Sequence, residues 1–565
     1  MNSRILKQTS VNKTHLLILI CMIIFSCAPQ TQPVQNEIPH LTKRGNATQL
    51  IVDGMPFLLL AGELHNSSSS SREYMKDIWP ELEKSGMNTV LAAVEWSLIE
   101  PEEGKYDFTV VDNLVDDART YHLRLVLLWF GAWKNGQSHY APEWVKKDYN
   151  RFQRVKAESG KSLEILTPLG KESMQADSRA LAEMMKHLKE IDSSQRTVIM
   201  IQVQNEVGVL GSPRDHSDIA NASFNEPVPK ELMDYLVKNK ETLLPELTEV
   251  WKTTGFKQSD TWEEVFGKGV KTDELFMAWY YARYLNACAS TAKAEYDIPM
   301  FVNAWIVQPE DKKPGDYPSG GPQAHVLDLW RAAAPSIDLL CPDIYLPNFE
   351  EICELYTRNN NVLFIPESRA GEQGAGQLFY AIGKHNAIGY SPFGYENRVT
   401  GIENEPITKA YKILSWFAPV ILDAQSNGTI TSVLLKQDKN ASEEVTSGNY
   451  KLLVELLRNR RSAEVTAEGY CIIINSAQDE YILYGRNVQI SFSPIKPGTA
   501  IAAIAQLDEG KYEDGKWIQG RRLNGDDIML DYDLAKKALE NKTGTGLKFG
   551  NNNELVQRVK LYRYE

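Results

Sequence analysis

The chain is poor in cysteine and histidine, and the spacing of both excludes the common metal-binding motifs. Its 565 residues include six cysteines and nine histidines. No CxxC pair occurs, and neither residue type forms the close clusters that structural zinc sites need. We therefore expect no metal site. The four cysteines beyond the amino-terminal region are expected to be buried free thiols, with a Cys341–Cys353 disulfide as the open alternative: Cys288, Cys341, Cys353 and Cys471.

Positive charge and phosphate-binding motifs are also scarce. The 61 Lys and Arg residues face 74 Asp and Glu residues, which leaves a net charge of −13. Such a field repels phosphate backbones and anionic lipid, so nucleic acid is excluded as a partner. No GxGxxG or GxxxxGK[ST] motif follows an apolar run, so the sequence gives no support to a nucleotide site.

No apolar run long enough to span a bilayer is apparent. The run from Leu16 to Phe25 has about ten residues, whereas a spanning helix needs about 20. Basic residues and no acids precede it, which indicates an export signal over 1–26. Ser26-Cys27 resembles a bacterial lipoprotein cleavage box, which implies acylation of Cys27 and a periplasmic or cell-surface lipoprotein; a plain secretory signal is the alternative. Residues 27–44 are expected to form a solvated tether.

What the chain does contain is the composition and patterning of a large globular protein, with 43% hydrophobic residues. Over residues 45–423, apolar runs alternate with amphipathic stretches, which predicts βα units on a parallel sheet. We expect an α/β fold, a (β/α)₈ TIM barrel, with a doubly wound sheet as the alternative. Residues 424–565 show short alternating strands, which predict a smaller, mostly-β, sandwich-like domain. The eight candidate barrel strands are 57–61, 89–96, 123–130, 197–203, 300–305, 337–345, 362–366 and 387–392.

Two of these strands end in carboxylates. The fourth runs into Gln204-Asn205-Glu206, and the seventh is followed by Glu367. In a TIM barrel the carboxyl ends of the strands share one rim and carry the reactive groups. Two facing carboxylic acids are what cleavage of a glycosidic bond needs, about 5 Å apart for retention of configuration and about 6.5–9.5 Å for inversion. Glu206 and Glu367 are therefore the candidate catalytic pair.

Three phrases of the sequence resemble glycoside hydrolase family 35, the β-galactosidases of the retaining barrel clan. They are Ala61-Gly62-Glu63-Leu64-His65-Asn66, Val94-Glu95-Trp96 with its continuation to Phe108, and Gln202 to Gly208. The β-rich tail resembles the uncharacterised carboxyl-terminal domain found in one branch of that family. The resemblance implies a retaining, exo-acting β-galactosidase that needs no cofactor or metal.

By the same resemblance, Glu206 is the general acid/base, Glu367 is the nucleophile, and Asn205 hydrogen-bonds the sugar 2-hydroxyl. The family usually has Glu where this chain has Gln204, which weakens the inference of galactose specificity. Further substrate-binding candidates follow other strand ends, because sugar rings stack on aromatic planes while their hydroxyls seek polar partners. They are Glu63, Trp96, Trp129, Asn303, Trp305 and Tyr345. Tyr345 is also placed to hydrogen-bond Glu367.

Carbohydrate is thus the expected partner, and the oligomeric state is open. Two other functions remain as alternatives. One is the same two-glutamate chemistry on another glycoside, such as an arabinoside, glucan or mannan. The other is a surface lipoprotein that captures glycans without cutting them. Retention of both carboxylates on the proper strands argues against the second alternative.

Overall fold

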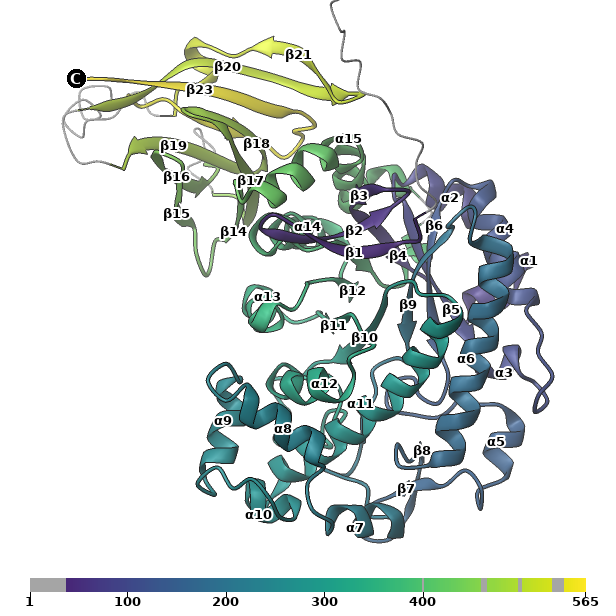
Figure 1. Ribbon diagram of the computed structural model, residues 1–565. Coiled ribbons are helices and arrows are strands. Elements are labelled where there is room, and N and C mark those ends of the chain that lie inside the picture. The colour runs from purple at the N-terminus through teal and green to yellow at the C-terminus, as the bar shows by residue number, and fades with distance from the viewer. Residues whose placement is uncertain (1–36, 399–400, 459–464, 496–499, 531–542) are drawn as a thin grey trace, which may run out of the picture. The chain divides into compact units, whose positions relative to one another are not determined.

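The computed structural model describes residues 37–398, 401–458, 465–495, 500–530 and 543–565 (Figure 1). The predicted export signal and Cys27, the predicted site of acylation, lie outside these described residues. Within the described ranges, no helix is both long and apolar enough to cross a lipid bilayer.

All eight predicted barrel strands are present, and they form one parallel sheet. Its order is β11-β10-β9-β6-β5-β4-β13-β12. The edges meet through a parallel bridge between Ile344 and Ser368, where the Ile344 amide donates a 2.9 Å hydrogen bond to the Glu367 carbonyl. The predicted barrel is therefore confirmed, and it closes beside a candidate catalytic residue. The strands are β4 (Leu59–Glu63), β5 (Thr89–Glu95), β6 (Arg124–Phe130), β9 (Val198–Val203), β10 (Met300–Trp305), β11 (Leu339–Asp343), β12 (Ile365–Ser368) and β13 (Gly389–Pro392).

Strand alternation divides the barrel residues between two cores. In β6, Leu125, Leu127 and Trp129 pack in the cluster shared with the helices. Val126, Leu128 and Phe130 pack in a second cluster inside the barrel. Both faces of the strand are buried, which is why the strand sequences read as continuous apolar runs.

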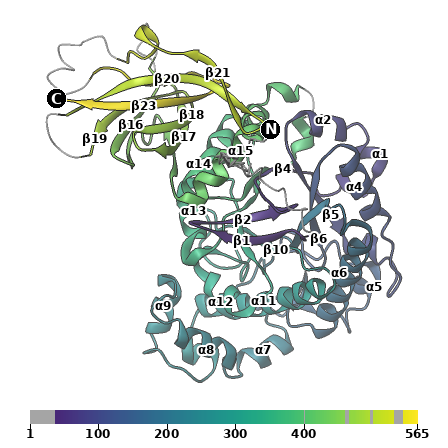
Figure 2. The same cartoon turned by 45° about the horizontal axis from the view of Figure 1, so that its top comes forward.

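A three-stranded antiparallel sheet covers the amino-terminal end of the barrel, as Figure 2 shows. It comprises β1 (His40–Arg44), β2 (Ala47–Val52) and β3 (Met55–Phe57). Leu50 and Val52 enter the interior cluster, and the Asp53 carboxylate accepts hydrogen bonds from Arg124, which begins β6, and from Arg196, which precedes β9. The tether predicted over 27–44 is therefore wrong for residues 40–44, which pair with β2.

Helices surround the sheet and also occur in the connections between strands. The longest are α6, α11, α14 and α15, and α15 runs to Asn427, four residues beyond the predicted end of the barrel. Cys288, Cys341, Cys353 and Cys471 are free and buried, so the expectation of free thiols is confirmed. The helices are α1 (Arg72–Met75), α2 (Trp79–Lys84), α3 (Trp96–Ile99), α4 (Thr109–Thr120), α5 (Glu143–Lys147), α6 (Lys171–Asp192), α7 (Asp218–Phe224), α8 (Lys230–Lys238), α9 (Pro245–Lys252), α10 (Trp262–Phe266), α11 (Val270–Glu295), α12 (Leu327–Ala333), α13 (Phe349–Tyr356), α14 (Gly371–His385) and α15 (Pro406–Asn427).

The carboxyl-terminal region consists of two antiparallel sheets around their own apolar core, as the sequence predicts. The larger sheet has the order β14-β17-β18-β23-β20-β21, and the smaller has the order β15-β16-β19-β22. Leu434, Tyr470 and Ile472 join the core of the barrel helices, so the larger sheet packs against the barrel. The strands are β14 (Ile430–Lys436), β15 (Ser442–Ser447), β16 (Tyr450–Leu456), β17 (Glu468–Ala477), β18 (Glu480–Arg486), β19 (Val488–Pro494), β20 (Ile501–Glu513), β21 (Lys516–Arg522), β22 (Leu547–Phe549) and β23 (Val556–Tyr564). A separate hairpin pairs β7 (Arg154–Lys156) with β8 (Ser162–Leu166).

Candidate active site

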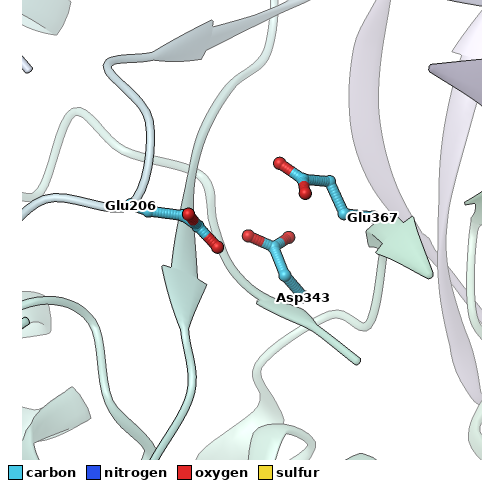
Figure 3. A group of neighbouring side chains, drawn as sticks. All are labelled: Glu206, Asp343 and Glu367. Carbon is cyan, nitrogen blue, oxygen red and sulfur yellow. The ribbon is translucent and has the colours of Figure 1, made fainter. Parts of the chain in front are cut away.

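Three carboxyl groups converge at the carboxyl-terminal rim of the barrel. Glu206 follows β9, Asp343 ends β11, and Glu367 lies in β12. Figure 3 shows the three side chains pointing toward one another, and one oxygen from each lies within 4.8 Å of the others. Glu206 and Glu367 are each 5% exposed. The structure therefore brings the two predicted glutamates into one nearly enclosed site and adds a third acid.

The backbone that presents Glu206 adopts a sparsely populated conformation. Gln204 and Glu206 have φ angles of 63° and 45°, in the left-handed region that non-glycine residues seldom adopt. The buried Gln204 amide holds this turn, because it accepts a 2.9 Å hydrogen bond from the Trp133 backbone and donates one of 2.7 Å to Asp177. Backbone strain of this kind persists where surrounding contacts enforce it, often at functional sites.

The carboxylate of Glu367 is surrounded by hydrogen-bond donors and a positively charged group. The Asn205 amide donates to Oε1 at 3.1 Å, and the Tyr345 hydroxyl donates to Oε2 at 3.0 Å. The Lys134 ammonium lies 3.9 Å from Oε1. Donors and a cation of this kind favour the ionised carboxylate, which is the form that a nucleophile needs.

Glu206 has the opposite environment. Burial, followed by the negative charge of Glu367, raises the pKa of Glu206 to about 7. Its side chain accepts a 2.8 Å hydrogen bond from Asn135, and its backbone amide donates one of 3.0 Å to Asn303. Two carboxyl groups on one rim therefore differ in character, as an acid and a nucleophile must.

Asp343 links to Glu206 directly. Burial and the charges of Glu367 and Glu206 raise its pKa well above the usual value, and its carboxyl group hydrogen-bonds that of Glu206. The Asn303 amide donates to the other side of this carboxyl group at 2.7 Å. The raised pKa favours the protonated form of Asp343, and in that form Asp343 donates the hydrogen bond to Glu206.

Glu63 and Lys134 complete the charge balance of the site. Burial and the charge of Glu367 raise the pKa of Glu63 well above its usual value. Burial lowers the pKa of Lys134, but the surrounding carboxylates, Glu367 first, outweigh that effect and raise it. The site thus places one lysine cation among four acids, and the raised pKa values of Glu63, Glu206 and Asp343 favour the neutral forms of those three.

The converging oxygens of Glu206, Asp343 and Glu367 are also the donor type that a hard cation binds. Ca²⁺ and Mg²⁺ take six or more oxygen ligands and require them to be ionised. Here the buried Lys134 ammonium, 3.9 Å from Glu367, already supplies positive charge to the same carboxyl groups. The donor set fits a shared proton and a lysine cation better than a metal ion.

Two predicted substrate-binding tryptophans are core residues. Trp129 is fully buried on the helix side of β6, where its indole donates to Asp177 at 2.8 Å. Trp96 is fully buried in α3 and donates to Glu100 at 2.8 Å. The position of Trp129 at a strand end does not say which face of the barrel its side chain occupies, and Trp96 begins a helix directly after β5.

The remaining predicted residues lie at or near the rim with different roles. Tyr345 contacts Glu367 as predicted. The Asn303 side chain bonds Asp343 and the backbone of Glu206, so its observed contacts are with the protein's own acids. Trp305 is partly buried at the end of β10. Glu63 is fully buried with neither carboxyl oxygen hydrogen-bonded among the described residues, so its role in binding sugar stays a prediction.

Sequence reasoning missed Lys134, Asn135 and Asp343. Asp343 has a signal in the sequence, because it is two residues beyond Cys341, which faces the barrel interior, and alternation puts both on one face. Lys134 and Asn135 lie on the loop after β6, where no periodicity marks them.

A cavity of about 710 Å³ lies against another loop of this rim, lined by His65, Asn66, Ser67, Ser68, Ser70, Ser71 and Tyr74.

Two family models match parts of the chain. Residues 65–268 match the glycoside hydrolase 42 model, described as "Beta-galactosidase". That is a glycoside hydrolase model of β-galactosidase type, but not the model of family 35, to which the motifs pointed. Residues 407–532 match a "Domain of unknown function (DUF5597)". The barrel segment is therefore similar to β-galactosidases, and the matched tail has no function attached to it.

Individual relatives agree with the family model. Beta-galactosidase 14 of Arabidopsis thaliana is 27% identical over 213 residues, which are 35% of this chain and 22% of that protein. The beta-galactosidase of Xanthomonas manihotis is 29% identical over 181 residues, 31% of this chain and 27% of that protein. The aligned segments thus span about a quarter of these relatives. A crystal structure of beta-galactosidase from Bacillus circulans sp. alkalophilus aligns with a TM-score of 0.44 and 17% identity, over 65% of this chain and 57% of that one.

Proposed function

We propose that the protein is a retaining exo-glycosidase that removes terminal β-galactose from glycans. The observation that carries the proposal is the approach of the Glu206 and Glu367 oxygens to within 4.8 Å of each other. Retaining glycosidases hold their two carboxyl groups about 5–5.5 Å apart, whereas inverting enzymes leave room for a water between them. Galactose as the sugar, and family 35 as the family, rest on the sequence phrases and on the names of the similar proteins.

In the first step the carboxylate of Glu367 attacks the anomeric carbon, and the bond from that carbon to the leaving oxygen breaks. Glu206, whose pKa is about 7, gives its proton to that oxygen. In the second step Glu206 takes a proton from water, and the water oxygen displaces Glu367 from the anomeric carbon. Each proton lent by the enzyme is thereby recovered.

Asn205 supports this chemistry from between the two acids. Its amide nitrogen donates to Glu367, while its Oδ1 is buried without a hydrogen bond among the described residues. That oxygen is free to accept from the sugar 2-hydroxyl. A hydrogen bond to this hydroxyl that strengthens in the transition state lowers the barrier by several kcal/mol, on the order of 3.

Proton NMR of the sugar first released from an aryl β-galactoside tests activity, sugar and stereochemistry together. We expect the β-anomer first, and initial release of the α-anomer contradicts the retaining mechanism. Glu367→Gln should abolish turnover, while the control Glu351→Gln, at an exposed position of α13, should leave it intact. Full turnover by Glu367→Gln refutes the assignment. A panel of aryl glycosides separates galactosidase activity from arabinosidase, glucosidase and mannosidase activity.

We also propose that the protein is exported and acylated on Cys27. The basic residues, short apolar run and Ser26-Cys27 junction support this proposal. Metabolic labelling with a fatty acid should mark the wild-type protein and not Cys27→Ala. Equal labelling of both contradicts it.

A further inference from the structure

One face of the larger sheet in the carboxyl-terminal domain gathers polar side chains and a single indole. Gln506 pairs with Lys560 and Asp508 with Arg558 across β20 and β23, while Tyr512 pairs with Trp517 across β20 and β21. Directly paired residues lie on the same side of a sheet, and alternate residues of a strand share a side. The intervening Leu507, Val559 and Leu561 enter the domain core. The polar set therefore lies on the face turned away from that core.

This face contains a cavity of about 300 Å³, and Trp517 is its aromatic wall. The indole crosses β20 at Gly510, where an added Cβ would lie 2.8 Å from the ring. The guanidinium of Arg558 lies 5.0 Å from the ring centroid, and Tyr512 packs against the indole edge-on. Because Gly510 has no side chain, the indole of Trp517 has room to lie across β20, and Arg558 and Tyr512 hold it in place.

Hydrogen-bonding groups surround the indole. The amides of Gln506 and Gln519 both donate to the buried carboxylate of Asp508. Among the described residues, the carbonyl oxygen of each amide accepts no hydrogen bond. The buried carboxylate of Asp508 therefore fixes the orientation of both amides, and their carbonyl oxygens remain available as hydrogen-bond acceptors beside the indole.

The charged residues that line the cavity are two carboxylates, Glu480 and Asp508, and two cations, Lys560 and Arg558, so the lining itself carries no net charge. Lys560 pairs with Glu480 at 2.9 Å, and Arg522 pairs with Asp508 at 2.7 Å. Arg558 is the remaining cation, and it lies over the indole. An ion of either sign would meet a like charge in this lining, so the cavity favours an uncharged ligand.

We propose that this cavity is a binding site for a neutral saccharide. A sugar ring presents a C–H face that stacks on an indole and hydroxyls that pair with amides and carboxylates. The cavity is lined by residues of the carboxyl-terminal sheet and by none of the proposed catalytic residues, so it does not depend on the proposed catalytic activity. It gives the carboxyl-terminal domain a ligand in addition to its packing against the barrel.

Affinity electrophoresis tests the proposal on the full chain carrying Glu367→Gln, so that no probe is hydrolysed. The probes are soluble β-galactan, β-glucan, β-mannan and arabinan, with polygalacturonate as the anionic counterpart. We expect at least one neutral polysaccharide to retard the protein. Trp517→Ala should weaken that retardation about tenfold or more, as loss of a central aromatic contact does, and Gln519→Ala, which removes an amide that pairs with sugar hydroxyls, should weaken it measurably. Ile518→Ala, an exposed neighbour on the opposite face, should not.

The variants distinguish this site from the barrel and from a structural role. Binding at the barrel alone leaves retardation equal in all variants, which overturns the proposal. Loss in Trp517→Ala with full binding in Gln519→Ala and a lowered melting temperature shows only a packing role and also overturns it. No retardation by any neutral probe, or stronger retardation by polygalacturonate, refutes the ligand class. With Glu367 intact, Trp517→Ala should hydrolyse a small aryl galactoside at the wild-type rate if the proposed function holds.

Discussion

The ammonium of Lys134 lies 3.9 Å from Oε1 of Glu367, and the two side chains are only 6% and 7% exposed. Removing one member of a buried ion pair leaves an uncompensated charge, at a cost of about 3–5 kcal/mol. Lys134 also acts on Glu206, since its charge opposes the rise of that residue's pKa. The charge of Lys134 therefore acts on both proposed catalytic residues, Glu206 and Glu367.

Lys134→Met should lower kcat/KM and move the whole pH profile to higher pH. On the acid side, loss of the cation disfavours ionised Glu367; on the basic side, Glu206 holds its proton to higher pH. We expect a fall of about 100-fold at pH 6, corresponding to about 2.7 kcal/mol. Initial rates on an aryl β-galactoside from pH 4 to 9 measure it, with the exposed Lys147→Met as control. An unshifted profile would mean that Lys134 has no electrostatic role.

Tyr345→Phe should lower kcat more than it changes KM. The variant removes the hydroxyl that donates to Glu367 Oε2 at 3.0 Å and leaves the ring in place. A hydrogen bond to a charged group contributes about 1.5–3 kcal/mol, so kcat should fall about 10- to 100-fold. Steady-state kinetics with the exposed Tyr149→Phe as control give the comparison. A wild-type kcat would show that this hydrogen bond does not position or stabilise the carboxylate.

The fold and the catalytic pair were accessible from the sequence because both depend on local patterns. Continuous apolar runs mark strands buried on both faces, and Glu206 and Glu367 follow such runs directly. The lining of the site was less accessible. Trp129 lies two residues after Leu127, so both side chains point to the same face of β6, which is the face toward the helices. The pairing of β6 with β9 also shifts register near the start of β6. Lys134 lies on a loop whose course is set by contacts distant in sequence, so no spacing rule finds it.

The proton on Glu206 should control both activity and stability on the basic side. Its pKa is about 7 in the folded chain, against 4.5 for the ordinary side chain. The folded state thus binds this proton more tightly, and its stabilising contribution is complete below about pH 4.5 and is lost as pH rises through 7. We expect kcat/KM to fall above pH 7, and the melting temperature of Glu206→Gln to decline less between pH 5 and 8 than that of the wild type. Parallel declines would contradict the raised pKa.

Asp343→Asn tests whether Asp343 is protonated. An amide reproduces the shape of a protonated carboxyl group, so it can donate to Glu206 and still accept from Asn303. We therefore expect kcat within about tenfold of the wild type and a basic limb displaced by less than about one pH unit. Asp343→Leu, which offers neither contact, should lose far more activity. A large displacement of the limb in Asp343→Asn would show that Asp343 is ionised instead.

The contacts of Gln204 explain why this position holds an amide and not the Glu expected from the resemblance to family 35. Its amide must accept from the Trp133 backbone and donate to Asp177 at the same time. A carboxylate in its place could accept but would face the Asp177 carboxylate at hydrogen-bond distance. Asp177 is fully buried, and burial raises its pKa to about 6.

Gln204→Glu should therefore destabilise the barrel, and the loss should grow with pH. Near pH 5 the introduced carboxyl group and Asp177 can share a proton, which replaces the lost amide donor. Near pH 8 both are driven to ionise without water, at a cost of about 3 kcal/mol or more. Thermal unfolding at both pH values measures the difference, with the exposed Gln195→Glu as control. A deficit that is equal at the two pH values would mean that packing, rather than the hydrogen bond to Asp177, fixes glutamine at this position.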